Sequence, residues 1–234
     1  MPATLRVLLA LSFIAGFADT ATFIQLYGLF SAHVTGNFVL LAAAIGKGVR
    51  ENDILKLLSF PVFIFAAAAA TIVHDRFHGE KPETSLDRWL AVTAGALLIL
   101  GGLLALFFGR KSEANDISFA DATAGMLSVA AMGVQNAVHR FAVALGPPTT
   151  VMTGTVTQLT VMATRKLLRA SVLAGKAPAQ AFSLQGLLWL AAAFAAGCLV
   201  SAPLTLVFGL ISLIIPGILL VAAALRPEAR SWTS

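Results

Sequence analysis

The chain has 234 residues, of which 58% are hydrophobic and only 12% are charged, and its mean hydropathy is +0.88. An average soluble domain is about 45 to 50% apolar and about 25% charged, so this composition excludes a soluble globular protein and makes lipid the main solvent of the side chains. The formal charge of +5 does not indicate a nucleic-acid partner, because the basic residues lie between long apolar runs and form no clustered face.

The predicted elements are membrane segments. A transmembrane helix needs about 20 mostly apolar residues to cross about 30 Å of hydrocarbon. In chain order, the charge-poor stretches are Leu5–Phe30, His33–Ile45, Leu57–Val73, Trp89–Phe108, Ile117–Leu145, Thr149–Thr164, Leu184–Val200 and Pro203–Leu225. The second and sixth stretches are short, which leaves open whether segments 33–45 and 149–164 span the membrane or re-enter it.

The basic residues favour eight crossings. Lys and Arg accumulate in cytoplasmic loops, and eight crossings with a cytoplasmic N-terminus leave Arg76, Lys81 and Arg88 on the outer side. Six crossings with two re-entrant segments would instead place the loop from Lys47 to Lys56 outside, against this rule. We therefore predict an all-α, polytopic transmembrane bundle of eight membrane segments with both termini cytoplasmic. The alternative is six spans plus two re-entrant half-helices.

The two halves of the chain resemble each other. Ala15–Asp19 is echoed by Met132–Asn136, and Val34–Asn37 by Met152–Thr155, at nearly equal separation. Matched order and spacing indicate an internal duplication within a single integral membrane domain, residues 1–234, with repeats over 5–108 and 117–225. Eight crossings make these repeats parallel four-helix units, whereas six crossings make them inverted.

Two signatures carry a resemblance to a known family. The first is Gly16-x-x-Asp19 followed by His33-x-Thr35-Gly36-Asn37, and the second is Gly133-x-Gln135-Asn136-Ala137 followed by Thr149-Thr150-x-x-Thr153-Gly154-Thr155. Together they resemble the YoaK-like family of bacterial inner-membrane proteins, a domain family of unknown function, over nearly the whole chain. The resemblance implies a multi-pass protein of the bacterial inner (cytoplasmic) membrane and no particular substrate or reaction.

Asp19 is the main candidate for a functional group. It is the only carboxylate between Arg6 and Glu51, and a charged side chain at the centre of a membrane helix costs about 2.5 to 3.5 kcal/mol on insertion scales. Asp19 must therefore face protein or water, either to bind an ion, a proton or a solute, or as a structural ion pair or helix cap. We expect it to approach Arg140, unless Arg140 snorkels to the interface.

A second polar group surrounds Arg140. On a helix, Asn136 and Arg140 share one face, and Gln135 and His139 share the adjoining face. This combination suits a polar or anionic ligand, or a hydrogen-bonded seam between helices.

The Thr-Gly steps at Gly36 and Gly154 suit either close helix packing or helix breaks, where the amides of a new helix would favour an anion. The predicted binding residues are Asp19, His33, Thr35, Asn37, Gln135, Asn136, His139, Arg140, Thr153 and Thr155, with Gly16, Gly36, Gly133 and Gly154 as structural glycines.

The sequence contains no P-loop, dinucleotide motif, zincin pattern or serine-nucleophile elbow. We therefore predict no enzyme, no catalytic residue, no cofactor and no metal, and place His74 and His78 in an exposed loop. Repeats with polar residues at matching places favour a small-solute transporter with a site between the repeats. The alternative is a channel or a structural membrane subunit. Expected partners are the lipid bilayer, an unknown small polar or anionic solute and, as an option, a second copy of the chain, but no nucleic acid.

Overall fold

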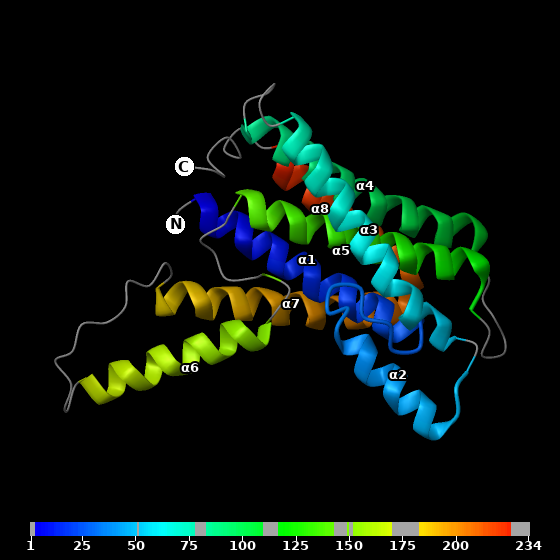
Figure 1. The fold of residues 1–234 in the computed structure, drawn as a ribbon, viewed down its shortest axis with the longest axis horizontal. Coiled ribbons are helices and arrows are strands. Elements are labelled where there is room, and N and C mark those ends of the chain that lie inside the picture. Colours follow the sequence, from blue (N-terminus) through cyan, green and yellow to red (C-terminus); the bar gives the residue numbers. More distant parts are fainter. Residues whose placement is uncertain are drawn as a thin grey trace.

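The computed structural model describes residues 3–50, 52–77, 83–109, 117–142, 149, 152–169 and 183–225. Regular structure within these ranges is helical, and the helices are α1 (Ala3–Gln25), α2 (Gly36–Lys47), α3 (Asp53–Phe77), α4 (Glu83–Phe108), α5 (Phe119–Ala142), α6 (Met152–Arg169), α7 (Leu184–Phe208), a short 3-10 helix η1 (Gly209–Leu213) and α8 (Ile214–Leu225). Figure 1 shows long helices packed side by side, with α2 and α6 projecting from the bundle.

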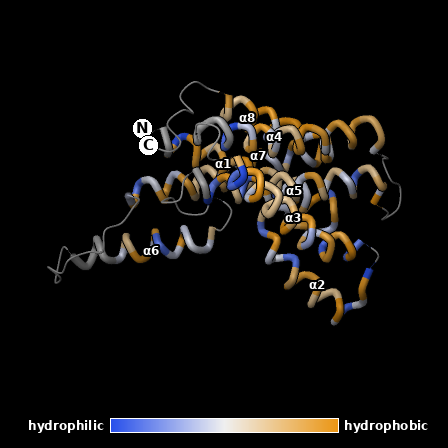
Figure 2. Tube along the Cα trace, turned by 45° about the horizontal axis from the view of Figure 1, so that its top comes forward, coloured by the Kyte–Doolittle hydropathy of each residue, from blue (hydrophilic) through white to orange (hydrophobic). Residues whose placement is uncertain are grey.

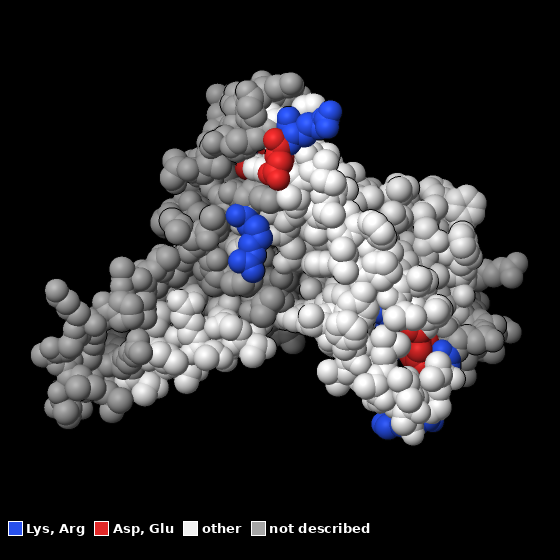
Figure 3. Space-filling view, in the orientation of Figure 1, with Lys and Arg blue, Asp and Glu red and all other residues white. Residues whose placement is uncertain are grey.

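The length and composition of the helices define a membrane protein. Stretches long and apolar enough to cross a membrane are Leu5–Gln25, Asp53–Phe77, Asp87–Phe108 and Leu184–Leu225. Apolar residues continue along most of the bundle (Figure 2). On the face shown in Figure 3, the described charged side chains gather in two groups, at the upper centre and the lower right, with uncharged surface between them. The predicted helical membrane protein is therefore confirmed.

Helix α1 is the central helix. In its apolar window 61% of residues are buried, against 11% in α3, which lies nearer the outside of the bundle. Helix α1 packs along α7, where Ser201 Oγ donates to the Phe17 carbonyl at 2.8 Å and Gln25 Nε2 donates to the Thr205 carbonyl at 3.0 Å. Because residue numbers rise together along both helices, α1 and α7 run parallel.

Helices α4 and α8 run in opposite directions. Gly95 lies against Val221, and Gly102 lies against Ile214, so residue numbers rise along α4 as they fall along α8. Glycines at this crossing let the two backbones approach closely, as is common in membrane helix pairs.

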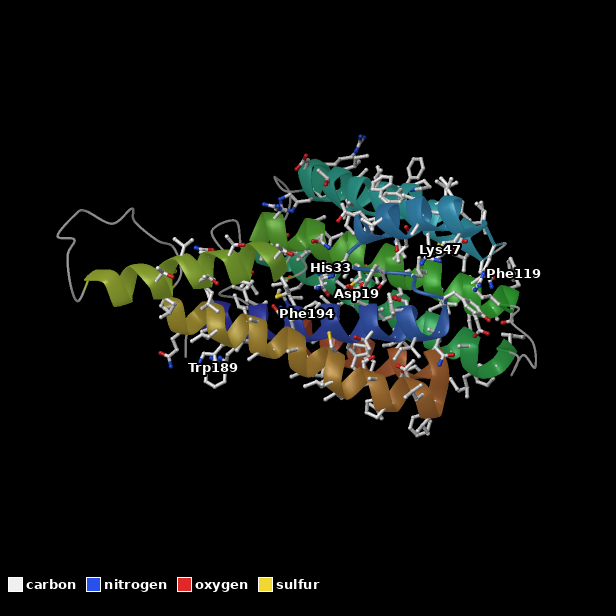
Figure 4. All side chains as sticks on the ribbon, turned by 90° about the horizontal axis from the view of Figure 1, so that it is seen from below. Asp19, His33, Lys47, Phe119, Trp189 and Phe194 are labelled. Atoms are coloured by element: carbon white, nitrogen blue, oxygen red, sulfur yellow. The ribbon has the colours of Figure 1, made fainter. Side chains whose placement is uncertain are left out.

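These directions correct the prediction of eight alternating crossings, which would make α4 and α8 parallel. Helix α2 has 12 residues and is about 18 Å long, too short for about 30 Å of hydrocarbon. Lys47 at its end lies toward the same end of the bundle as Phe119, where α5 begins (Figure 4). Helix α2 is therefore too short to span the hydrocarbon by itself, and the parallel four-helix repeats are not supported.

Predicted boundaries were also wrong where backbone conformation ends a helix within apolar sequence. Helix α1 ends at Gln25, five residues before the predicted Phe30, because the chain turns at Tyr27 and Gly28. Helix α7 continues through Pro203. The chain reverses at Gly209 instead, where φ is 61° and ψ is −147°, a conformation that only glycine adopts readily.

Candidate functional site: a pocket beside α1

The chain folds back against α1 directly after that helix ends. Tyr27 and Gly28 have positive φ angles of 51° and 86°, and residues 29–35 return without forming a helix before α2 begins. Lipid offers no hydrogen-bond partners, so non-helical backbone at membrane depth must be buried by protein or line a cavity. The re-entrant segment, residues 26–35, meets this condition, with Leu29 fully buried and Ala32 7% exposed.

Asp19 holds the re-entrant segment in place. Its side chain lies in α1 and is nearly buried. Asp19 Oδ1 accepts hydrogen bonds from the Ala32 amide at 2.6 Å, the His33 amide at 3.3 Å and Ser31 Oγ at 3.4 Å. Asp19 Oδ2 pairs with His33 Nδ1. These donors offset the cost of burying a carboxylate, which would be several kcal/mol without them.

Asn37 fixes the same segment from the other side. Its side chain is fully buried. Oδ1 accepts from the Phe30 amide, and Nδ2 donates to the Phe30 carbonyl and to Ser59 Oγ, each at 2.9 Å. Both polar atoms of the amide are therefore occupied, and Asn37 ties the segment to α3. We assign it a structural role instead of the predicted binding role.

His33 has a second ring nitrogen, Nε2, that is not part of the pair with Asp19. When Asp19 is ionised and the imidazole is neutral, Nδ1 carries the proton of the pair and Nε2 is an acceptor. The His33 side chain is 29% exposed, and its ring packs edge-on against Phe194 with centroids 5.4 Å apart. Figure 4 shows Asp19, His33 and Phe194 together, between the ends marked by Trp189 and Phe119.

The space beside His33 is a pocket of about 490 Å³. Its lining residues come from α1, the re-entrant segment, the start of α2 and α7, and they are Asp19, Thr20, Phe23, Phe30, His33, Thr35, Gly36, Phe194 and Cys198. Among the described residues of this lining, Asp19 is the only carboxylate, and none is a lysine or an arginine. A mostly apolar wall with a few placed polar groups is typical of small-molecule sites.

The pocket combines predicted and unpredicted residues. Asp19, His33 and Thr35 were predicted from the sequence, whereas Phe194 and Cys198 were missed. The last two are four residues apart and therefore share one face of α7. The run of small residues Ala195–Cys198 was the available signal, since small residues mark close helix contacts.

The predicted residues of α5 lie outside this lining. Gln135 is buried and donates from Nε2 to the Leu11 carbonyl at 3.1 Å. Asn136 donates to the Met132 carbonyl of its own helix at 2.8 Å, and His139 is buried. These contacts fit the structural seam that was the alternative interpretation of the cluster.

The expected approach of Asp19 to Arg140 was wrong. Asp19 pairs with His33, while Arg140 is exposed near the end of α5, where a long cationic side chain can snorkel. The physical reason is that three backbone and side-chain donors and one imidazole from the adjacent segment already satisfy the carboxylate.

The two Thr-Gly steps also differ from each other. At the start of α2, the Gly36 amide donates to the His33 carbonyl at 2.8 Å and the Asn37 amide donates to the Val34 carbonyl at 3.0 Å, so these amides do not offer the anion site that the sequence suggested. A methyl group added at Gly154, in α6, would have no described atom within 4 Å. Thr153 is exposed and Thr155 is buried on the same helix.

His74 also differs from its prediction. It lies in α3 and its side chain is only 12% exposed, with Nδ1 3.1 Å from Asp87 Oδ1. His78 lies outside the described residues. His74 is therefore part of a buried contact between α3 and α4 and does not lie in an exposed loop.

These features define a class: a multi-pass helical membrane protein with a re-entrant segment and an acid–imidazole pocket. The chain belongs to the family described as protein of unknown function DUF1275, whose family pattern matches residues 7–226. It is 29% identical over 156 residues to UPF0700 transmembrane protein YoaK of Bacillus subtilis (strain 168), over 67% of this chain and 64% of that relative, which is less than two thirds of the relative's length. No solved structure matches the chain. The YoaK-like resemblance is therefore confirmed.

Proposed function

We propose that this protein is a small-solute transporter of the bacterial inner membrane and that the pocket beside α1 binds the solute. The observation that carries the proposal is the buried Asp19–His33 pair, which borders a pocket midway along the bundle. Ionisable groups inside a membrane are costly and commonly functional, and transporters place their sites near the midplane beside interrupted helices. In this proposal the chain is not an enzyme, and Asp19 and His33 bind without catalysing a reaction.

We further propose six membrane crossings, made by α1, α3, α4, α5, α7 and the unit of η1 with α8. The directions of two helix pairs support this count. Six alternating crossings in this order make α1 parallel to α7 and α4 antiparallel to α8, as observed. Helix α5 has 24 residues, enough to cross, and packs against α3 and α4. Helices α2 and α6 then lie outside the set of crossings.

Six crossings make the two halves inverted repeats, and reciprocal contacts support that arrangement. Helix α1 packs on α7 and α5 packs on α3, so the first helix of each half meets the third unit of the other. Gly16 lies against the Phe194 carbonyl, and Gly133 lies against the Phe63 carbonyl. Phe63 and Phe194 occupy the same position counted from the first residues of α3 and α7.

The basic residues orient this topology. The end at which α1 begins carries Arg6, Arg76, Arg88 and Arg140, and by sequence the connections and terminus at that end add Lys81, Arg165, Lys166, Arg169, Lys176, Arg226 and Arg230. The other end has Lys47, Arg50, Lys56, Arg110 and Lys111. Because basic loops remain cytoplasmic, both termini are cytoplasmic in this proposal.

Single cysteines test the number of crossings. In a Cys198→Ala background, we expect Val49→Cys and Ser112→Cys to react with a membrane-impermeant maleimide in intact spheroplasts, and Glu80→Cys to react only after permeabilisation. Eight crossings require the opposite pattern at all three positions. Labelling of Glu80→Cys alone from outside would therefore reject six crossings.

Cys198 provides a direct test of transport through the pocket, because it is the only cysteine in the chain. In proteoliposomes assayed with a panel of amino acids, sugars, organic acids and amines, we expect saturable uptake with counterflow. Treatment with N-ethylmaleimide should lower this uptake at least tenfold, because the adduct occupies the pocket.

The matched control is Cys198→Ser, whose treated and untreated rates should be equal. Linear, non-saturating flux would instead identify a channel. Absence of flux for the whole panel, from protein that remains folded, would favour a structural subunit.

A further inference from the structure

We infer that the pocket beside α1 binds an organic monocation and that a proton competes with this cation at His33, so that the protein exchanges one for the other. The inference rests on the proposed function and adds the class of substrate and the coupling ion. It replaces the polar or anionic solute expected from the sequence.

The charge of the pocket selects the sign of the ligand. Among the lining residues, Asp19 supplies one negative charge, and His33 supplies at most one positive charge when protonated. The pair is therefore either −1 or neutral, and in neither state does it attract an anion. The α2 amides that could have done so at Gly36 and Asn37 are already hydrogen-bonded.

The aromatic walls of the pocket indicate which substituents the ligand carries. Phe23, Phe30 and Phe194 contribute aromatic rings from three different parts of the chain. Aromatic faces attract cations, most strongly at sites shielded from water, and a volume of about 490 Å³ lies in the range of small-molecule sites. An ammonium group with apolar substituents matches both the charge and the walls.

His33 is the group that a proton can reach. Its Nδ1 is bound to Asp19, and its side chain is 29% exposed and lines the pocket, so we place Nε2, the other ring nitrogen, on the pocket side. Besides Asp19 and His33, the titratable group among the described lining residues is Cys198 of α7. Beneath the re-entrant segment, Lys56 Nζ of α3 is bound to Asp53 Oδ1 at 2.7 Å, so that its charge is compensated.

The net charge of the Asp19–His33 pair gives a reason for the exchange of a proton for the cation. When a proton binds Nε2, the pair becomes carboxylate and imidazolium with no net charge, and when a monocation binds the neutral imidazole form, the occupied pocket again has no net charge. The empty, deprotonated pocket carries one net negative charge on Asp19, which its hydrogen-bond donors stabilise but do not neutralise. Conformational change is therefore favoured only when either a proton or the cation is bound, and charge is conserved because one replaces the other.

The binding test uses benzyltrimethylammonium as the probe and benzoate as the anion of similar shape, with the purified full-length protein in nanodiscs. We expect saturable binding of benzyltrimethylammonium, measured by equilibrium dialysis at pH 8, and at least tenfold weaker binding of benzoate. Between pH 8 and pH 5.5 the affinity for the cation should fall, approaching tenfold per pH unit once the proton occupies most of the protein, as competition by one proton requires.

Two variants and one control separate the role of Asp19 from that of His33. Asp19→Asn keeps an acceptor for the segment and lets His33 Nδ1 accept from the new amide, so it should fold but bind the cation at least tenfold more weakly. His33→Gln should have the same affinity at pH 8 and pH 5.5, whatever that affinity is. His74→Gln, which alters the buried His74–Asp87 pair, should keep the full pH dependence of the wild type.

Tighter binding of benzoate, absence of benzyltrimethylammonium binding, or an unchanged pH dependence in His33→Gln would each overturn the inference. Failure of the inference remains distinguishable from failure of the proposed function. If another solute shows flux that N-ethylmaleimide blocks while benzyltrimethylammonium does not bind, the protein is a transporter with a different substrate.

Discussion

Replacing Asp19 with alanine should lower the free energy of unfolding by about 3 to 5 kcal/mol, as expected when one partner of a buried pair is removed. The substitution leaves the Ala32 and His33 amides without their acceptor, and each unsatisfied buried donor costs about 1 to 3 kcal/mol. It also leaves His33 Nδ1 without its partner. The measurement is reversible unfolding of the detergent-solubilised protein, followed by circular dichroism.

The control for this prediction is Asp121→Ala. Asp121 lies in the first turn of α5, where its amide bonds Ser118 Oγ at 3.1 Å and its Oδ2 accepts from Ser118 Oγ at 2.7 Å. Loss of such a cap costs about 1 kcal/mol. Equal effects of the two alanine substitutions would show that Asp19 does not hold the re-entrant segment.

Replacing Gly95 with leucine should prevent accumulation of folded protein, and Gly95→Ala should cost about 1 to 3 kcal/mol, the usual penalty for overpacking. A methyl group on Gly95 would lie 2.8 Å from the Gly217 carbonyl oxygen, and one on Gly217 would lie 2.8 Å from the Gly95 carbonyl oxygen. Because backbone atoms cannot move aside as a flexible side chain can, α4 and α8 would have to separate. Detergent-solubilised yield and thermal unfolding measure the two effects.

The reciprocal contact makes a sharper form of this prediction. Gly217→Ala should cost about as much as Gly95→Ala, and the double variant should be less destabilised than the sum, since one separation of the helices relieves both contacts. The matched control is Gly46→Ala in α2, where no described atom lies within 4 Å of an added methyl group. There the change should be neutral or stabilising by up to about 1 kcal/mol. Additive losses at Gly95 and Gly217 would contradict a shared crossing.

The sequence by itself determined that the protein lies in the membrane, that it is helical and that it is related to YoaK. Hydrophobicity is summed along a single stretch of chain, so the apolar stretch around Trp89–Phe108 indicated a span without knowledge of its neighbours. The sequence also showed that Asp19 needs partners, because the cost of a charge in lipid does not depend on the fold.

Only the tertiary structure decided which residues are the partners of Asp19. The positive φ angles at Tyr27 and Gly28 bring residues 31–33 back to Asp19, and no hydropathy pattern records a change of direction within apolar sequence. The same limitation misplaced the reversal between the last two apolar stretches, which was expected before Pro203 and lies at Gly209. Phe194 and Cys198 join the pocket because α7 packs parallel to α1, and a contact across so many residues depends on which helices lie side by side rather than on local spacing.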